Sequence, residues 1–488
     1  MLSPHRHRPT EDDQAVLAPR YGSRYMESPV PRDALPAARL PPEVAYQLVH
    51  DELNLDGNPA LNMATFVSSW MEPHADRLMT EAMGKNFIDA DEYPQTTEIQ
   101  TRCVNMLARL WHAPAPHAPA LHASAPQTPT AHDDAAHAAG AVGTATVGSS
   151  EAIHLAGLAL KWRWRARRQA AGSGTERPNL VMSQGVQVCW EKFARYFDVE
   201  PRYVPLEEGR YVLDVDRALD LVDDDTIGVV AILGTTYTGE YEAVRELSEA
   251  LDVQNTRMGR DVGIHVDAAS GGFVAPFLTP ELRWDFRLRL VRSINASGHK
   301  YGLVYPGVGW VVWRTAADLP TELVFHVNYL GGDQPTFNLN FSRGAGQIIA
   351  QYYNFLRLGM AGYAEVMGSL DHTARFLAAA VMRTGHFELL SKPDGLPLVC
   401  ARLKGERPYT VFDLSAKLRE RGWIVPAYTM APDAEAIAVL RMVVRESLSL
   451  DMADCLAADL DSAVRYFDTA GADAAQAPRQ ETKTKGVC

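Results

Sequence analysis

The fold is decided by the stretch Ser297-Gly298-His299-Lys300-Tyr301-Gly302, which follows a short β-branched run at residues 293–296. A lysine that ends a buried strand pays a desolvation cost unless its charge is neutralised. A Schiff base with an aldehyde removes that charge, and the same lowered pKa makes the amine nucleophilic. The flanking glycines let the backbone bend around a bound group. The stretch predicts a lysine that carries an aldehyde, the alternative being a loop lysine in solvent.

A second apolar run, Ile264-His265-Val266, ends in Asp267-Ala268-Ala269. One interpretation is an ordinary helix N-cap after a strand. The other is a buried carboxylate that keeps the pyridine nitrogen of pyridoxal 5'-phosphate (PLP) protonated, so that the ring acts as an electron sink. Asp267 and Lys300 lie 33 residues apart, each at the end of an expected strand. The carboxyl ends of strands are where open α/β sheets bind ligands.

A third element is Gly143-Thr-Ala-Thr-Val-Gly148-Ser149-Ser150-Glu151, which leads into an expected helix at residues 149–171. Hydroxyl groups, free backbone N–H groups and the helix dipole at such a start can bind a phosphate. The alternative is a serine N-cap with an acidic residue in the first turn. Phosphate cradle, ring carboxylate and aldehyde lysine occur in the chain order of a PLP enzyme with the aspartate-aminotransferase fold.

The surrounding pattern predicts an α/β protein of fold type I with a mostly parallel central sheet. Apolar, β-branched runs at 227–233, 264–266, 293–296 and 308–313 alternate with helical patterns such as 243–253. Strands that alternate with helices favour a parallel sheet covered on both faces. A long helix is expected at 344–382, followed by a smaller α+β domain with segments near 396–403, 423–426 and 438–444.

Along the chain we expect an N-terminal arm (1–60) with a short helix at 42–53, a large PLP-binding domain (61–370), a small C-terminal domain (371–470) and a flexible tail (471–488). Residues 113–140 form an Ala/Pro/His-rich insert. His112, His117, His122, His132 and His137 recur on a loose five-residue spacing. We interpret the insert as a mobile surface loop rather than a metal-binding or pH-sensing tract, because proline breaks helices and no other ligand type recurs beside the histidines.

Composition excludes some classes of function. The 488 residues include 47 basic and 60 acidic side chains, a net charge of −13 with histidine neutral, which argues against nucleic acid as a partner. No run of 18 apolar residues predicts a membrane span, and residues 1–20 lack the apolar core of a signal peptide. Five widely spaced cysteines suggest neither a disulfide framework nor a metal site. We expect a cytoplasmic enzyme without integral membrane association.

With these motifs in order, the sequence closely resembles the glutamate decarboxylases of bacteria and plants from about residue 42 to about 450. The matching segments include Asp51-Glu-Leu-Asn-Leu-Asp-Gly57, Ala64-Thr-Phe66, Lys85-Asn-Phe-Ile-Asp89, Glu92-Tyr-Pro94, Arg102-Cys-Val-Asn105, Gly148-Ser-Ser-Glu-Ala152, Cys189-Trp-Glu-Lys-Phe-Ala-Arg-Tyr196, His265-Val-Asp-Ala-Ala-Ser-Gly-Gly272 and Ser297-Gly-His-Lys-Tyr-Gly302. The resemblance implies PLP-dependent α-decarboxylation of L-glutamate to γ-aminobutyrate and carbon dioxide, with one proton consumed.

The resemblance also implies roles for individual residues. Lys300 would hold the cofactor aldehyde, and Lys300 or His299 would donate the proton. The cofactor would be bound by Ser149, Ser150, Gln187, Thr236, Asp267 and His299, with Gln187 stacked on the ring. The substrate pocket, shared with a neighbouring subunit, would include Thr65, Phe66, Asn86, Asp89 and Arg441, with Arg441 on the α-carboxylate. Without the resemblance, Thr65, Gln187, Asn86 and Arg441 would be interpreted as a helix cap, a surface amide, a turn residue and a surface ion pair.

A site shared between subunits implies a homo-oligomer, at least a dimer, with a hexamer as a larger alternative. The chain departs from the family at its C-terminus. Thr484-Lys485-Gly486-Val487-Cys488 lacks the penultimate histidine of some enteric members, and the segment after Gly471 has no aromatic residue, so we expect no calmodulin binding. Two alternatives stay open: the same chemistry on aspartate, cysteine sulfinate or an aromatic amino acid, and a non-catalytic interaction protein with a PLP fold.

Overall fold

The computed structural model describes residues 31–114 and 140–470. The predictions for the first 30 residues, for most of the His-rich insert and for the C-terminal tail lie outside these ranges. By its internal contacts the chain divides into two units, Met1–Pro59 and Ala60–Cys488. In the first unit, helix α2 (Pro42–Leu53) is where the sequence predicts it. No helix within the described ranges is long and apolar enough to cross a membrane.

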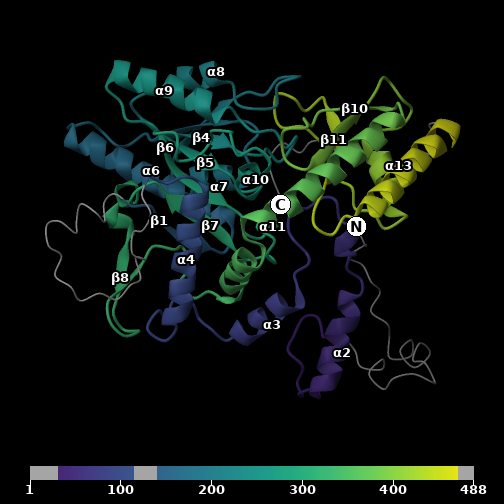
Figure 1. The fold of residues 1–488 in the computed structure, drawn as a ribbon, viewed down its shortest axis with the longest axis horizontal. Coiled ribbons are helices and arrows are strands. Elements are labelled where there is room, and N and C mark those ends of the chain that lie inside the picture. Colours follow the sequence, from purple (N-terminus) through teal and green to yellow (C-terminus); the bar gives the residue numbers. More distant parts are fainter. Residues whose placement is uncertain (1–30, 115–139, 471–488) are drawn as a thin grey trace. The chain divides into compact units, whose positions relative to one another are not determined.

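A seven-stranded sheet forms the centre of the second unit (Figure 1). Its strand order is β1-β7-β6-β5-β4-β2-β3, and all neighbouring pairs are parallel except β1–β7 and β6–β7. The prediction of a mostly parallel central sheet is therefore confirmed. The strands are β1 (Val142–Thr146), β2 (Asn179–Ser183), β3 (Glu200–Val204), β4 (Thr226–Ile232), β5 (Gly263–Asp267), β6 (Val291–Ala296) and β7 (Gly309–Trp313).

Helices bury both faces of the middle of this sheet, which explains why central strands such as β4 are almost continuously apolar, whereas the edge strand β3 is largely polar and partly exposed. All seven residues of β4 are buried; Val230 and Ile232 pack in a cluster with α6 and α7, whereas Val229 and Ala231 face the main core. Helix α6 crosses several strands and contacts β4 to β7. The helices of this part are α3 (Pro73–Ala82), α4 (Pro94–Leu110), α6 (Ser149–Ala170), α7 (Val188–Tyr196), α8 (Val215–Asp220), α9 (Val244–Met258) and α10 (Ala275–Leu278).

A smaller antiparallel sheet, in the order β10-β11-β13-β12, follows a long helix, α11 (Gly346–Arg383). Figure 1 shows α11 leading from the central sheet to this smaller one, beside α13. The elements of this C-terminal part, the smaller sheet and its helices, are β10 (Phe387–Leu389), β11 (Leu398–Leu403), α12 (Val411–Arg419), β12 (Ala427–Thr429), β13 (Ala438–Val443) and α13 (Leu450–Ala470). A two-stranded sheet, β8 (Phe325–Val327) with β9 (Gln334–Thr336), precedes α11.

The structure corrects three details of the prediction. The expected helix at 344–382 is broken at Gly359, whose φ of 57° and ψ of −167° suit glycine alone, so two helical segments meet there. The segment expected at 423–426 precedes the strand, which lies at Ala427–Thr429; buried Trp423 instead donates its indole N–H to Asp459. β1, β2 and β3 have no counterpart among the predicted runs, since each contains only one valine or isoleucine.

Candidate active site

A cavity of about 300 Å³ opens at the carboxyl ends of the central strands. Residues from five segments line it: 147–151 after β1, 185–189 before α7, 232–236 after β4, 267–270 after β5 and 297–300 after β6. The cavity therefore brings together Ser149, Ser150, Gln187, Thr236, Asp267, His299 and Lys300, the cofactor residues that the sequence predicts. In a parallel sheet these strand ends meet at one edge, which is why residues 151 positions apart in the chain become neighbours.

Lys300 lies in a tight turn after β6. The Lys300 N–H bonds to the Ser297 carbonyl oxygen, and Ser68 Oγ donates to the Lys300 carbonyl oxygen at 2.9 Å. A Cβ on Gly302 would lie 2.5 Å from the Gly298 carbonyl oxygen, so the turn needs glycine there. The Lys300 ammonium donates to Ser270 Oγ at 3.1 Å. Burial lowers its pKa, while the nearby Asp267 carboxylate acts in the opposite direction.

The Asp267 carboxylate is held on both oxygens. Trp190 Nε1 donates to Oδ2 at 2.9 Å, Asn295 Nδ2 donates to Oδ1 at 3.1 Å, and the Ala269 backbone N–H also donates to Oδ1 at 3.1 Å. No helix N-cap is assigned to Asp267, since β5 ends at this residue and a 3₁₀ turn begins only at Gly271. The carboxylate is 6% exposed and faces the cavity, where it can pair with a cation.

The start of α6 forms a cradle of small residues. A Cβ on Gly309 of β7 would lie 2.4 Å from the Gly148 carbonyl carbon, so only glycine allows this close approach. Ser149 Oγ lies 2.7 Å from Ser297 Oγ, which joins the cradle to the lysine turn. Ser149 is partly buried and Ser150 is exposed to the cavity. With the free N–H groups of the helix start, this donor set fits a phosphate.

Glu151 organises the same end of α6. Its buried carboxylate accepts from the Val147 N–H at 2.8 Å and from the Leu339 N–H at 2.9 Å, with a longer contact to the Asn340 N–H at 3.4 Å. It therefore fastens the segment before α11 to the cradle.

His299 and Gln187 complete the cavity wall. Burial lowers the pKa of His299 to about 4, with Lys300 contributing, so the imidazole is neutral near pH 7. His299 Nδ1 is buried and has no hydrogen-bond partner among the described residues. Gln187 is exposed and caps α7, accepting from the Cys189 N–H at 2.7 Å. The unpartnered ring nitrogen and the cradle indicate a site shaped for a polar cofactor.

Arg441 of β13 connects two segments at the cavity edge. Its guanidinium donates to the Thr236 carbonyl oxygen at 2.5 Å and to the Ala64 carbonyl oxygen at 2.6 Å. The Arg441 Cζ lies 4.9 Å from the Phe66 ring centroid, and the Lys300 Nζ lies 5.4 Å from the same centroid. Arg441 Nε is buried without a partner among the described residues. Phe66 and Arg441 are thus close to the lysine, and partly buried Thr65 precedes Phe66.

Asn86 and Asp89 do not line this cavity in their own chain. Asn86 Nδ2 donates to Ser342 Oγ at 3.3 Å, Asn86 Oδ1 accepts from the Arg343 N–H at 3.3 Å, and Asp89 Oδ1 accepts from the Glu92 N–H at 3.0 Å. Both lie in the connection between α3 and α4, next to the segment that leads into α11.

Sequence reasoning missed several residues at the site. Ser270, the partner of the Lys300 ammonium, and Ser297, the partner of Ser149, lie inside motifs that were recognised without a role for them. Trp190 and Asn295, which hold Asp267, could be found only once α7 and β6 were placed beside β5.

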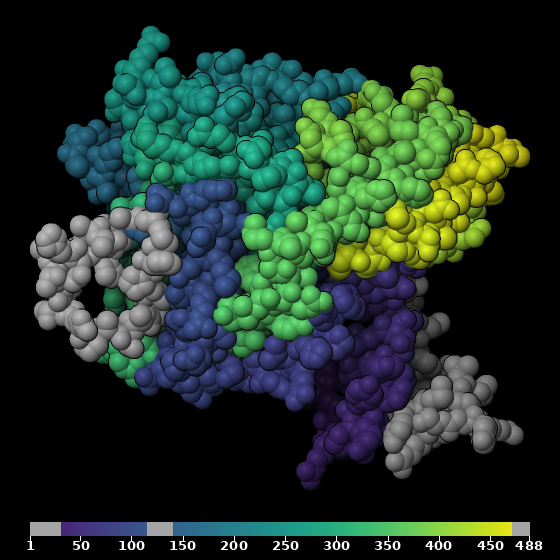
Figure 2. All heavy atoms as spheres, viewed as in Figure 1, coloured from purple at the N-terminus to yellow at the C-terminus, as the bar shows by residue number. Residues whose placement is uncertain are grey.

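A larger cavity of about 520 Å³ between α4, α10 and α11 contains none of the predicted residues; α4 and α11 lie side by side in Figure 2.

These features fit PLP. The cavity offers an amine for the aldehyde, a carboxylate for the ring nitrogen and a helix start with hydroxyl groups for the phosphate. Within the protein, Ser270 contacts the Lys300 ammonium, Trp190 contacts the Asp267 carboxylate, and Gly309 lets β7 approach the cradle closely. The match to PLP rests on all three of these chemical groups together rather than on any single residue.

Comparison with known proteins also indicates a PLP-dependent protein. Residues 36–404 match the pyridoxal-dependent decarboxylase conserved domain. Glutamate decarboxylase from Solanum lycopersicum is 53% identical over 98% of this chain and 90% of its own length, and glutamate decarboxylase 5 from Arabidopsis thaliana is 53% identical over 91% and 86%. The solved glutamate decarboxylase of Lactobacillus brevis is 45% identical, with a TM-score of 0.84 over 93% of this chain and 99% of that one. The chain therefore belongs to the pyridoxal-dependent decarboxylases and, within them, to the glutamate decarboxylases.

Proposed function

We propose that this protein removes the α-carboxylate of L-glutamate and releases γ-aminobutyrate and carbon dioxide, consuming one proton per turnover. The observation that carries the proposal is the cavity in which Lys300, Asp267 and the Ser149–Ser150 cradle converge. When bound there, PLP supplies a covalent attachment for the substrate's amino group and an electron sink for the electron pair left by carbon dioxide. Residues of the protein bind the substrate and supply the proton.

In this proposal Lys300 holds the cofactor until substrate arrives, and its ammonium then has a proton to give to the α-carbon. Its lowered pKa supports this role, because the buried ammonium gives up its proton more readily than that of an exposed lysine. His299 is the alternative donor. Its neutral imidazole and unpartnered Nδ1 are better suited to a contact with the cofactor than to carrying the proton, so we favour Lys300.

Arg441 is proposed to bind the substrate's α-carboxylate. Its buried, unpartnered Nε and its position against Phe66 support the role, because a guanidinium in an apolar setting binds a carboxylate strongly. Gln187 and Thr236 are proposed to contact the cofactor from the cavity wall, and Thr65 and Phe66 to border the substrate. Gln187 and Thr236 line the cavity with Lys300, Phe66 lies 5.4 Å from the Lys300 ammonium, and Thr65 precedes Phe66 in the chain.

We further propose a homo-oligomer, at least a dimer and in larger form a hexamer, in which Asn86 and Asp89 serve the cavity of a neighbouring subunit. That neither residue lines the cavity of its own chain supports this. Coexpression of two inactive variants, Lys300→Ala and Asp89→Asn, under different affinity tags tests it. A mixed dimer would contain one site with both native residues, so purified heterodimers should recover activity; inactive heterodimers would contradict a shared site.

We also propose a cytoplasmic location. Cys103, Cys189, Cys400 and Cys455 all carry free thiols, as expected in a reducing compartment. Fractionation of cells that produce the protein would test this.

The function itself is tested with purified protein, added PLP and a panel of glutamate, aspartate, cysteine sulfinate and an aromatic amino acid across pH 4 to 8. γ-Aminobutyrate is measured directly and carbon dioxide is measured for the whole panel. We expect glutamate to be preferred. Faster turnover of another amino acid would retain the chemistry and replace the substrate, and a chain that binds no PLP would contradict the function altogether.

A further inference from the structure

Four buried polar side chains lie in a row behind the cavity, on one face of the central sheet. In the pairing of β5 with β6, His265 is opposite Ser293 and Asp267 is opposite Asn295. Side chains two positions apart on a strand point to the same face, so the two cross-strand pairs stack as a ladder. Ser293, His265 and Asn295 are 1%, 0% and 0% exposed, which removes water as their partner.

Hydrogen bonds connect the four residues without a gap. Ser293 Oγ lies 2.8 Å from His265 Nδ1, His265 Nε2 lies 2.8 Å from Asn295 Oδ1, and Asn295 Nδ2 donates to Asp267 Oδ1 at 3.1 Å. The Trp190 ring lies edge-on to His265, 5.3 Å between centroids, and its indole N–H donates to the other oxygen of Asp267. The Asp267 carboxylate therefore accepts from Asn295 on one oxygen and from Trp190 on the other.

The direction of every donor follows from the chemistry. A carboxylate only accepts, so Asn295 turns its NH₂ group to Asp267 and its oxygen to His265. His265 must then carry its proton on Nε2 and accept on Nδ1 from the Ser293 hydroxyl. Burial lowers the pKa of His265 to about 4, so near pH 7 the ring has one proton and this tautomer is the one that satisfies all three bonds.

We propose that Ser293, His265 and Asn295 act as one hydrogen-bond relay that holds the Asp267 carboxylate in a single orientation opposite the ring nitrogen of bound PLP. Bonds that all point the same way polarise one another, so the last donor, Asn295 Nδ2, binds the carboxylate more strongly than an isolated amide. Asn295 is a positioning residue, and His265 acts through it. The inference rests on the proposed role of Asp267 in binding the cofactor.

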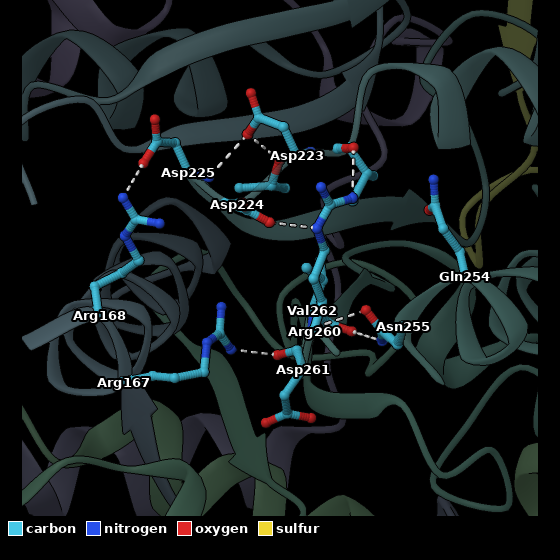
Figure 3. Close-up of polar contacts among 12 residues, drawn as sticks. Arg167, Arg168, Asp223, Asp224, Asp225, Gln254, Asn255, Arg260, Asp261 and Val262 are labelled. Carbon is cyan, nitrogen blue, oxygen red and sulfur yellow. Dashed lines mark hydrogen bonds and ion pairs between the residues drawn. The ribbon is translucent and has the colours of Figure 1, made fainter. Parts of the chain in front are cut away.

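The test uses variants that remove the bonds but keep the volume. Asn295→Leu removes both of its bonds, and His265→Phe keeps a ring against Trp190 while losing both nitrogens. The matched control is Asn255→Leu. Asn255 is a buried asparagine of α9 whose amide bonds only the Val262 backbone, at 2.9 and 3.2 Å, at the opposite end of β5 (Figure 3). It shares the burial and bond count of Asn295 and lacks the connection to Asp267.

Three quantities are measured for each variant: the dissociation constant for PLP added to protein stripped of it, the visible absorbance band of the bound cofactor with its pH midpoint, and the melting temperature. We expect Asn295→Leu to weaken PLP binding on the order of tenfold or more, by analogy with the loss of a hydrogen bond that supports a metal ligand, and to shift the band and its midpoint. Asn255→Leu should lower only the melting temperature.

A double-mutant cycle distinguishes a relay from independent contacts. If the bonds act as a unit, the His265→Phe, Asn295→Leu double variant binds PLP no more weakly than the worse single variant. Additive losses, or an Asn295→Leu variant with unchanged affinity and spectrum, would overturn the relay. Should Asn295→Leu fail to fold, Asn295→Ser, too short to reach both partners, is judged by the same readouts. If the unmutated chain binds no PLP, the proposed function fails instead.

Discussion

The Lys300 ammonium donates a hydrogen bond to Ser270 Oγ at 3.1 Å, so the turn after β6 is tied directly to the turn after β5. Ser270 follows Asp267 by three residues, and Ala269 between them donates its N–H to the Asp267 carboxylate. The two charged groups of the proposed cofactor site are therefore fixed by one short segment.

Replacing Lys300 with alanine should abolish turnover and the visible absorbance of the bound cofactor, because the covalent attachment is lost. A steady-state assay with glutamate and an absorbance spectrum after gel filtration check both. The control is Lys392→Ala, since Lys392 is 58% exposed and forms an ion pair with Glu240 away from Lys300. A Lys300→Ala protein with more than trace activity would remove the lysine from the mechanism.

Replacing Glu151 with alanine should weaken PLP binding and destabilise the fold by roughly 3 kcal/mol, because buried N–H groups of Val147 and Leu339 lose their acceptor. Urea unfolding and cofactor titration measure the two effects. Glu246→Gln is the control, because Glu246 is exposed on α9 and forms an ion pair with neighbouring Arg245. Equal behaviour of the two variants would show that Glu151 does not support the cradle.

Replacing Arg441 with lysine should lower kcat/KM for glutamate by roughly a hundredfold, which corresponds to about 3 kcal/mol. A single ammonium cannot reach both the Thr236 and Ala64 carbonyl oxygens and still present a donor to substrate. Arg402→Lys, on β11 of the same sheet with surface partners Glu388 and Glu208, is the control and should keep wild-type kinetics. A normal kcat/KM in Arg441→Lys would rule out this arginine as the carboxylate site.

Stability should fall as pH decreases from about 6.5 toward 4 through the buried histidine His299. Its pKa in the folded chain is about 4 against 6.5 unperturbed, so the unfolded chain binds a proton first and acid favours unfolding. The contribution is fully present above pH 6.5 and lost toward pH 4, with a slope of at most about 1.4 kcal/mol per pH unit. Urea unfolding of wild type and His299→Asn between pH 7 and 5 should show a shallower slope in the variant.

Glu242 opposes this trend, because complete burial raises its pKa to about 7. A raised carboxyl pKa stabilises the fold below pH 4.5 and loses that effect as pH rises through 7. The comparison of slopes in His299→Asn removes this contribution, since Glu242 is the same in both proteins. Identical slopes would mean that His299 is not the group that titrates.

Two glycines of α11 should respond oppositely to alanine. Gly359 has a φ of 57°, so Gly359→Ala should destabilise the chain by about 1 to 2 kcal/mol. Gly368 lies within the helix, and an added Cβ meets no atom within 4 Å, so Gly368→Ala should stabilise it by about 0.5 to 1 kcal/mol. Melting curves of the two variants, measured with saturating PLP, provide the comparison. Destabilisation by both would contradict a break confined to Gly359.

The main cofactor groups and several strands could be predicted from the sequence, because each is formed by residues that are adjacent in the chain. Lys300 in a glycine turn, Asp267 at the end of an apolar run and two serines at a helix start each follow from residues adjacent in the chain. Strands β4 to β7 were visible as apolar, β-branched runs for the same reason. Strands β1 to β3 were not, because each has only one valine or isoleucine among its five residues.

By itself, the sequence determined which groups are available and the order in which the strand ends present them: an amine, a carboxylate and a cradle. Only the tertiary structure decided what surrounds them, since Ser270, Trp190 and Asn295 reach Lys300 and Asp267 through strand register and helix packing. It also separated Asn86 and Asp89 from the cavity of their own chain. Register and packing depend on contacts between residues far apart in the chain, and no local pattern encodes these.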